Sequence, residues 1–267
     1  MSRSGADHDC RTIGASPYDK GMDDLVDTTE MYLKSVLEME EEGVPALRAR
    51  ISERLEQAGP TVSQTVARME RDGLIVVSAD RHLVLTEHGR RTAINVMRKH
   101  RLAECLLSEV IGLDWEHLHE EACRWEHVMS DQVEQRLLKL LSRPTVTPYG
   151  NPIPAPDELT MRAASDTATV NLVRFVADST EPVRGRIRWI GEPLQVYPAI
   201  LGQLQRAGVL PGETGTFTLH GPSVFVTMDG RTETVELQHQ FAAHLFVSAP
   251  IGQAPVVQAQ EHSALSA

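Results

Sequence analysis

The sequence is poor in cysteine and lacks any long hydrophobic run. Its 267 residues include three cysteines, Cys10, Cys105 and Cys123, which lie far apart. An odd, scattered set does not build the disulfide framework of a small secreted protein. No apolar segment approaches the roughly 20 residues that a membrane span requires, and the polar N-terminus, with Asp7 and Asp9, is unlike a signal peptide. We therefore expect a cytoplasmic protein that does not bind membranes.

Familiar catalytic motifs are missing as well. The chain has no P-loop, no Rossmann glycine fingerprint, no GxSxG nucleophile elbow and no HExxH zinc motif. These absences argue against the corresponding enzyme classes, and we expect that the protein is not an enzyme. A metalloenzyme stays open as an alternative, because the chain does contain clustered metal-ligand residue types.

Negative charge dominates the chain, but it is unevenly distributed. The formal net charge of -11 would by itself argue against a nucleic acid partner. Between Pro45 and Arg101, however, eleven basic residues stand against six acidic ones. A locally basic segment in an acidic protein is typical of a nucleic-acid-binding surface.

The basic segment has the element order of a winged helix-turn-helix. The sequence predicts helices over Asp27–Glu42, Ala46–Leu55 and from Pro60 to a stop at Gly73, then a hairpin of Leu74–Val77 and His82–Leu85. In such a module the third helix enters the major groove. Many small α+β domains also combine short helices with a hairpin, so the order alone leaves that alternative open.

The third helix has two distinct faces, which favours DNA binding. Val62, Val66 and Met69 repeat at i, i+4, i+7 and predict a buried face. The other face is predicted to carry the hydroxyl, amide and guanidinium groups of Thr61, Gln64, Thr65, Arg68 and Arg71. Such groups hydrogen-bond to base edges and phosphates.

The remaining chain changes character twice. Glu87 to about Leu141 reads as helical, with apolar stripes wide enough for a core and a partner subunit. Prolines in residues 142–156 preclude regular helix and predict an extended tether. Short β-like runs then predict a small β-barrel, interrupted by a helix at Tyr197–Ala207. These runs are Val170–Val176, Gly185–Ile190, Thr216–His220, Ser223–Met228 and Thr234–Leu237.

Metal-ligand residue types gather in the helical region. At 100° per residue, His119, Cys123, Glu126 and His127 fall on one face of a helix. A mixture of imidazole, thiol and carboxylate suits a first-row transition metal better than calcium or magnesium. His100 and Glu104, spaced i, i+4 on the preceding helix, could face this set. Taken singly, each of these residues is more often a surface or core residue than a ligand.

Five blocks closely resemble the diphtheria toxin repressor and iron-dependent regulator family of actinobacteria. They are Asp24–Leu33, Leu47–Ile51, Gly59–Gly73, Met97–Glu104 and Glu121–Ser130. The resemblance runs from about Asp24 to Pro154 and is looser beyond. It implies a mainly α fold with α+β parts, in three domains. These are a winged helix-turn-helix at 22–93, a helical dimerisation and metal-binding domain at 94–141 and, after a tether at 142–169, an SH3-like β-barrel at 170–247. Residues 1–21 and 248–267 are expected to be a disordered extension and a disordered tail.

The resemblance also implies two metal sites and an anion site. The regulatory metal site would use Met31, Cys123, Glu126 and His127, with the backbone carbonyl of Cys123. The ancillary metal site would use His100, Glu104, His119, Glu192 and Gln195, the last two from a looser match at Ile190–Gln195. The anion site would use Arg101, Thr147 and Asn151, where Thr147 replaces the usual serine but keeps the hydroxyl. Because a thioether and a thiol soften the regulatory site, we expect Fe²⁺, with Mn²⁺, Co²⁺, Ni²⁺ or Zn²⁺ substituting in vitro.

The function implied is an iron(II)-activated transcriptional repressor of iron uptake and homeostasis genes. It would bind inverted-repeat operator DNA as a homodimer, with one or two dimers per operator. Gln64 would contact base edges, Ala58 and Pro60 thymine methyl groups, and Arg48, Arg50, Thr61, Ser63, Arg68 and Arg71 phosphates. Three alternatives stay open: a manganese- or zinc-responsive regulator of the same fold, a metalloenzyme, and a non-DNA interaction protein built on the SH3-like domain.

Overall fold

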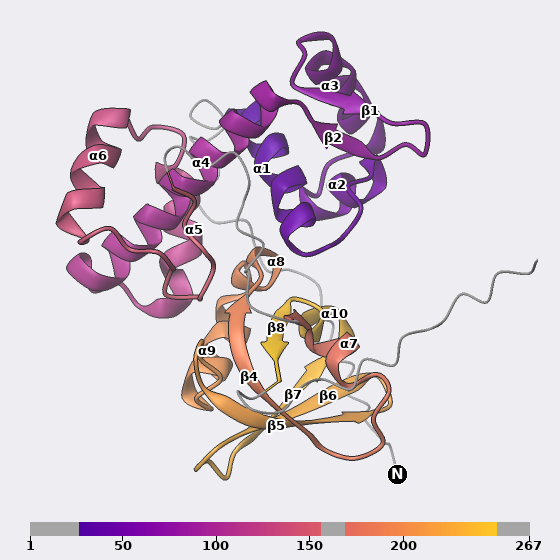
Figure 1. Cartoon of the computed structure of the whole chain (residues 1–267), viewed down its shortest axis with the longest axis vertical. Helices are drawn as coiled ribbons and strands as arrows, with labels where there is room; N and C mark the ends of the chain where they lie inside the picture. The colour runs from indigo at the N-terminus through magenta and orange to yellow at the C-terminus, as the bar shows by residue number, and fades with distance from the viewer. Residues whose placement is uncertain (1–26, 156–168, 250–267) are drawn as a thin grey trace, which may run out of the picture.

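The computed structural model describes residues 27–155 and 169–249. Figure 1 shows a winged-helix domain, a helical domain beside it, and a β-rich domain below both. The expected fold class is therefore confirmed. The predicted extension at 1–21, the second half of the tether and nearly all of the predicted tail lie outside the described residues.

The N-terminal domain has the predicted order of three helices and a hairpin. Its elements are α1 (Thr28–Glu41), α2 (Arg48–Arg54), α3 (Gly59–Arg71), β1 (Ile75–Val77) and β2 (Leu83–Leu85). The Asp27 carboxylate caps α1 by accepting from the N–H groups of Thr29 and Glu30. Gly73 follows α3 with a φ of 72°, a left-handed conformation that favours glycine and ends the helix. β1 and β2 pair antiparallel to form the wing.

This domain has a hydrophobic core of its own. As predicted, Val62, Val66 and Met69 of α3 are buried in it, packed with apolar residues of α1, α2 and the wing. The prediction that Thr65 faces outward is wrong, because only 8% of it is exposed. Thr65 follows Gln64 by about 100° of helix rotation, which turns it to the edge of the buried stripe.

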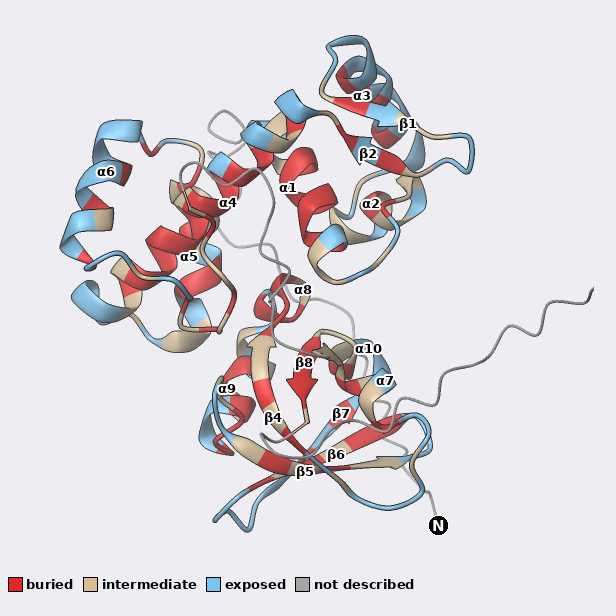
Figure 2. Ribbon diagram, in the orientation of Figure 1, coloured by how far each residue is buried: buried red, intermediate tan, exposed pale blue. Residues whose placement is uncertain are grey.

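The helical domain is less continuous than the sequence predicted. It contains α4 (Glu87–Leu106), a π-turn (Leu107–Ile111), a 3-10 turn (Trp115–His117), α5 (Leu118–Trp125) and α6 (Asp131–Leu140). Gly112 interrupts the helical pattern with a φ of 75° after the π-turn. The apolar stripes divide into buried and exposed members, and an exposed group lies on this domain. Its members are Val110, Ile111, Val128, Val133 and Leu140, here named the apolar patch. Much of α6 is accordingly pale blue in Figure 2.

The first half of the predicted tether is packed rather than free. Val146 bridges to Pro152, and the Tyr149 hydroxyl donates to the carbonyl of Trp115 at 2.6 Å. Tyr149 is fully buried, and its carbonyl accepts from the N–H of Ile190. Residues 144–155 therefore join the helical domain to the β-rich domain.

The C-terminal domain is a six-stranded antiparallel sheet in the order β3-β8-β4-β5-β6-β7. Its strands are β3 (Val170–Asn171), β4 (Val183–Ile190), β5 (Thr214–His220), β6 (Ser223–Met228), β7 (Thr234–Gln238) and β8 (Leu245–Ser248). Its helices are α7 (Leu172–Val176), α8 (Glu192–Gln195), α9 (Pro198–Arg206) and α10 (His239–Ala242). The prediction of one strand over Val170–Val176 is wrong, because the Asn171 side chain accepts from the N–H of Arg174 and begins α7.

Two hydrophobic cores divide the described residues, and α4 belongs to both. Ala93 and Met97 pack in the winged-helix core. Leu102 and Cys105, further along the same helix, pack in a second core that is continuous from the helical domain into the sheet. His100 lies between these two groups on α4. No helix among the described residues has the length and apolarity of a membrane span.

Candidate functional site

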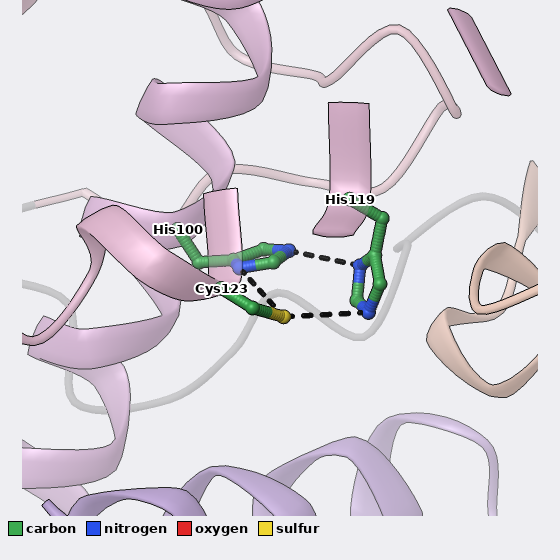
Figure 3. Close-up of side chains that lie close together, drawn as sticks. All are labelled: His100, His119 and Cys123. Carbon is green, nitrogen blue, oxygen red and sulfur yellow. Dashed lines mark hydrogen bonds between the residues drawn. The ribbon is translucent and has the colours of Figure 1, made fainter. Parts of the chain in front are cut away.

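Three of the predicted metal ligands lie together in the helical domain. His100 comes from α4, and His119 and Cys123 are one turn apart on α5. The Cys123 Sγ lies 3.5 Å from His119 Nε2 and 4.0 Å from His100 Nδ1, and the two imidazoles approach to 3.2 Å. Figure 3 shows the three side chains pointing toward one another. Their ligand atoms all lie within 4.8 Å of one another, close enough to share one ion.

Two carboxylates flank this cluster. Glu104 Oε1 lies 2.9 Å from His100 Nε2 and 3.6 Å from His119 Nδ1. Glu126 Oε2 lies 2.6 Å from His100 Nδ1, and its Oε1 lies 3.2 Å from His127 Nε2. The prediction that His119 to His127 share one helix needs correction, because α5 ends at Trp125. Glu126 keeps helical angles (φ -57°, ψ -38°) and therefore still faces the cluster.

The structure brings together residues that the resemblance assigns to different metal sites. Cys123, assigned to the regulatory site, contacts His100 and His119, assigned to the ancillary site. Met31 is half-buried on α1 and packs against the winged-helix core. Its neighbour Glu30 reaches His127, with Oε2 at 2.8 Å from Nδ1. The start of α1 therefore lies beside the metal-ligand cluster.

Sequence reasoning missed a lysine inside the cluster. The Lys34 ammonium on α1 lies 2.8 Å from Glu126 Oε2 and 3.1 Å from His100 Nδ1. Only 6% of its side chain is exposed. No signal of this was present in the sequence, because only the structure shows that Lys34 is buried within the run from Tyr32 to Met39. A lysine in such a run requires a buried anion as its partner.

The charges of the cluster shift its pKa values strongly. Burial opposes ionisation of the Cys123 thiol, but His119, Lys34 and His100 outweigh it and lower its pKa to about 5. Burial acts to lower the pKa of His119, yet Cys123 and Glu104 raise it to about 10. Burial likewise opposes protonation of His127, while Glu126 and Glu30 raise its pKa to about 9. Cys123 is thus a thiolate near neutral pH, the form that binds metals.

The C-terminal domain supplies the remaining predicted ancillary residues. Glu192 and Gln195 lie on the short helix α8 and are both buried. Glu192 Oε1 accepts from Arg101 Nη2 at 3.1 Å, and Gln195 Nε2 donates to Asn151 Oδ1 at 3.0 Å. The other oxygens, Glu192 Oε2 and Gln195 Oε1, are buried without a hydrogen-bond donor. Gln195 Oε1 therefore has unused capacity for a cation, whereas Glu192 Oε2 already lies 3.7 Å from the ammonium of Lys34.

The predicted anion-site residues are near one another, but Arg101 is already paired. Both carboxylate oxygens of Glu41 accept from its guanidinium, at 2.9 and 2.6 Å, as does the carbonyl of Pro152. Thr147 Oγ1 lies 3.5 Å from Asn151 Oδ1. An external anion at Arg101 would therefore compete with Glu41.

These residues fit a divalent transition metal. Imidazoles, a thiolate and carboxylates converge within bonding reach of one another, and two further buried oxygens lack donors. Thiolate and imidazole ligands select iron, cobalt, nickel or zinc over magnesium or calcium.

The predicted DNA-contacting residues lie on α2, on α3 and just before α3 in the winged-helix domain. Those on and just before α3 are all exposed: Ala58, Pro60, Thr61, Ser63, Gln64, Arg68 and Arg71. Arg48 and Arg50 on α2 are half-buried, and Arg50 Nη1 donates to the carbonyl of Pro45. Arg48 and Ser63 line a pocket that Arg81 of the wing also lines. Sequence reasoning missed Arg81 at this pocket, because only the fold brings the wing beside α2.

The fold and the site thus define a winged-helix protein with a buried cluster of side chains that could hold a transition metal. Comparison with known families agrees. Residues 24–83 match the family described as "Iron dependent repressor, N-terminal DNA binding domain". Residues 86–155 match the family described as "Iron dependent repressor, metal binding and dimerisation domain".

Individual relatives cover most of the chain. The iron-dependent repressor IdeR of Mycobacterium tuberculosis is 53% identical over 223 residues, covering 83% of this chain and 96% of its own. The diphtheria toxin repressor of Corynebacterium diphtheriae is 57% identical over 191 residues, covering 72% and 84%. A solved structure of T. acidophilum IdeR matches with a TM-score of 0.65 and 29% identity, covering 84% of this chain and 99% of that one. The chain therefore belongs to the iron-dependent repressor family, whose members are metal-dependent transcriptional repressors.

Proposed function

We propose that this protein is an iron(II)-activated repressor that binds inverted-repeat operators as a homodimer and controls iron uptake and homeostasis genes. The observation that carries the proposal is the convergence of His100, His119 and Cys123 beside α1, the first helix of the DNA-binding domain. A change at the cluster acts directly on α1. The names of the relatives and the two matched domain descriptions support the same function.

The ligands we assign follow the two sets named above. The regulatory site comprises Met31, Cys123, Glu126 and His127, and the ancillary site comprises His100, Glu104, His119, Glu192 and Gln195. A bound divalent ion would supply the positive charge that these carboxylates and the Cys123 thiolate need. Glu30 and Lys34 connect α1 to His127 and Glu126 within the same region. We infer that this region orients the DNA-binding domain, because it contacts residues from both domains.

The homodimer is supported by the apolar patch. Each member is at least 48% exposed, and together they lie on the domain whose description includes dimerisation. Several large apolar side chains exposed on one small domain are typical of an interaction surface. Two copies of α3, one per subunit, would then meet the two halves of an inverted repeat, with one or two dimers per operator.

The test is anaerobic fluorescence anisotropy with a labelled inverted-repeat operator. Fe²⁺, Mn²⁺ and Zn²⁺ are titrated in turn, chelator is added, and the series is repeated with Cys123→Ser. We expect tight binding that needs metal, reverses with chelator and weakens in the variant, and the titrations rank the metals. A ranking led by Mn²⁺ or Zn²⁺ would assign a different activating ion on the same fold. Equal binding with and without metal would exclude the metal switch. A complete lack of specific binding would shift the assignment to a metalloenzyme or an interaction protein.

A further inference from the structure

Lys34 places one buried ammonium group where three domains meet. Its Nζ lies 2.8 Å from Glu126 Oε2, beyond the end of α5, and 3.1 Å from His100 Nδ1 on α4. It also lies 3.7 Å from Glu192 Oε2 on α8 of the C-terminal domain. Lys34 itself belongs to α1 of the DNA-binding domain. A single cation thus contacts assigned metal ligands from both sites.

Two nearby arginine side chains pair with carboxylates other than Glu126. Arg101 pairs with both oxygens of Glu41 and with Glu192. Arg54 pairs with Glu42 at 2.7 Å and with Glu38 at 3.3 Å. Neither guanidinium has a described contact with Glu126. Glu126 is 3% exposed and would lack adequate solvation without a partner, since a buried carboxylate needs a compensating charge. Lys34, with the imidazoles of His100 and His127, supplies that partner.

We propose that Lys34 is a built-in competitor of the activating metal. Its ammonium group donates to the carboxylate of Glu126, beside His100 Nδ1, and a divalent ion that takes this carboxylate must displace it. This inference rests on the proposed function and adds a residue that sets the metal concentration at which the switch responds. The same displacement removes the contact between Lys34 and Glu192, so ligand exchange at the cluster also alters the link from α1 to the C-terminal domain.

The direction of the effect follows from charge. A positive group in contact with the ligands disfavours a second cation there, and the penalty is large in a buried site, where screening by water is weak. Removing the charge of Lys34 should therefore tighten metal binding. It should also destabilise the metal-free protein, because Glu126 would lose its ammonium partner.

The experiment compares Co²⁺ binding to the full chain and to Lys34→Met, by calorimetry after chelator treatment, with the cobalt–thiolate absorption band reporting on Cys123. We expect the Kd of Lys34→Met to fall at least about tenfold, a direction fixed by the removed charge. Lys34→Arg keeps the charge and should remain within about threefold of wild type. Lys139→Met removes an exposed lysine of α6 and should leave the Kd unchanged.

The outcomes separate this inference from the proposed function. Equal or weaker Co²⁺ binding by Lys34→Met, with wild-type binding intact, overturns the competitor role and leaves the metal sensor standing. Failure of the wild type to bind Co²⁺ overturns both. If Lys34→Met does not fold without metal, Lys34→Gln retains a hydrogen-bond donor for Glu126 and should shift the Kd in the same direction. An unchanged Kd in that variant also overturns the competitor role.

Discussion

At the scale of single residues, protons and metal compete for the same atoms. The pKa of Cys123 is lowered to about 5, so its thiol has already lost its proton at pH 7. The pKa values of His119 and His127 are raised to about 10 and about 9, so both imidazoles hold an extra proton at that pH. A metal ligand must be deprotonated at the nitrogen that binds. The histidines, and not the cysteine, should therefore release protons on binding.

We expect metal binding at pH 7 to release about three protons per chain when both sites fill, one each from His119, His127 and His100, whose pKa, despite burial, Glu104 and Glu126 also raise well above its usual value. Because rising pH removes the competing protons, the Kd should fall steadily from pH 6.5 to about 10, as the raised pKa values of His127, about 9, and His119, about 10, are passed in turn. Calorimetry of Co²⁺ binding in two buffers of different ionisation enthalpy gives the proton count directly. A count of zero, with a Kd that is independent of pH, would contradict the charge assignment.

Gln64 and Arg68 are both exposed on α3 but should differ in what they recognise. Gln64→Ala should cost about 1–3 kcal/mol on the operator and much less on random DNA, because an amide reads base edges. Arg68→Ala should weaken binding to both DNAs about equally and reduce the salt dependence by about one phosphate contact. Anisotropy at several salt concentrations measures both effects. Equal losses on operator and random DNA for Gln64→Ala would refute base reading.

At the scale of elements, α6 presents apolar side chains outward while remaining anchored to α4. Arg98 of α4 and Glu134 of α6 form a buried ion pair, so the inner face of α6 is fixed. Leu140 is 60% exposed on the outer side. A partner subunit is the ordinary reason for such exposure.

Leu140→Glu should convert the dimer to monomer, because it places a charge in an apolar interface that excludes water. Sedimentation velocity across a range of concentrations measures the change. Val76→Glu, which alters a valine that is 53% exposed on the wing, is the control and should remain dimeric. A dimer that survives Leu140→Glu would place the interface elsewhere.

Elements and site residues differed in how far the sequence could predict them. The winged helix was predictable because its signals are local: Asp27 caps α1, and Gly73 ends α3. The strand predicted over Val170–Val176 failed because β-branched composition concealed the cap at Asn171. The clustering of His100 with Cys123 was suggested by helix periodicity. The position of Lys34 could not be predicted in this way. Its partners His100, Glu126 and Glu192 are 66 to 158 positions away in the sequence, and helix periodicity reports only on residues close in sequence.

At the scale of the whole molecule, metal should act as a stabilising ligand. Binding to the folded state alone adds about 2.7 kcal/mol at a free metal concentration one hundred times the Kd. Chelator should therefore lower the melting temperature of the full chain, and re-added Co²⁺ should restore it. Calorimetric melting of wild type and Cys123→Ser measures this. The variant should lose most of the metal-dependent increase, and an equal increase in both proteins would show that Cys123 is not a ligand.

The division of the interior into two hydrophobic cores has a consequence for cooperativity. Ala93 and Met97 of α4 belong to the first core, and Leu102 and Cys105 belong to the second. Between them lie His100 and Arg101, which are buried polar residues and belong to neither core. Amide hydrogens of the winged helix should thus exchange as one set, and those of the helical and β-rich domains as another. His100 lies at the boundary between these two units, which we expect to open separately. A metal ion bound at His100 would connect them, so metal binding should determine whether the protein unfolds in one step or in two.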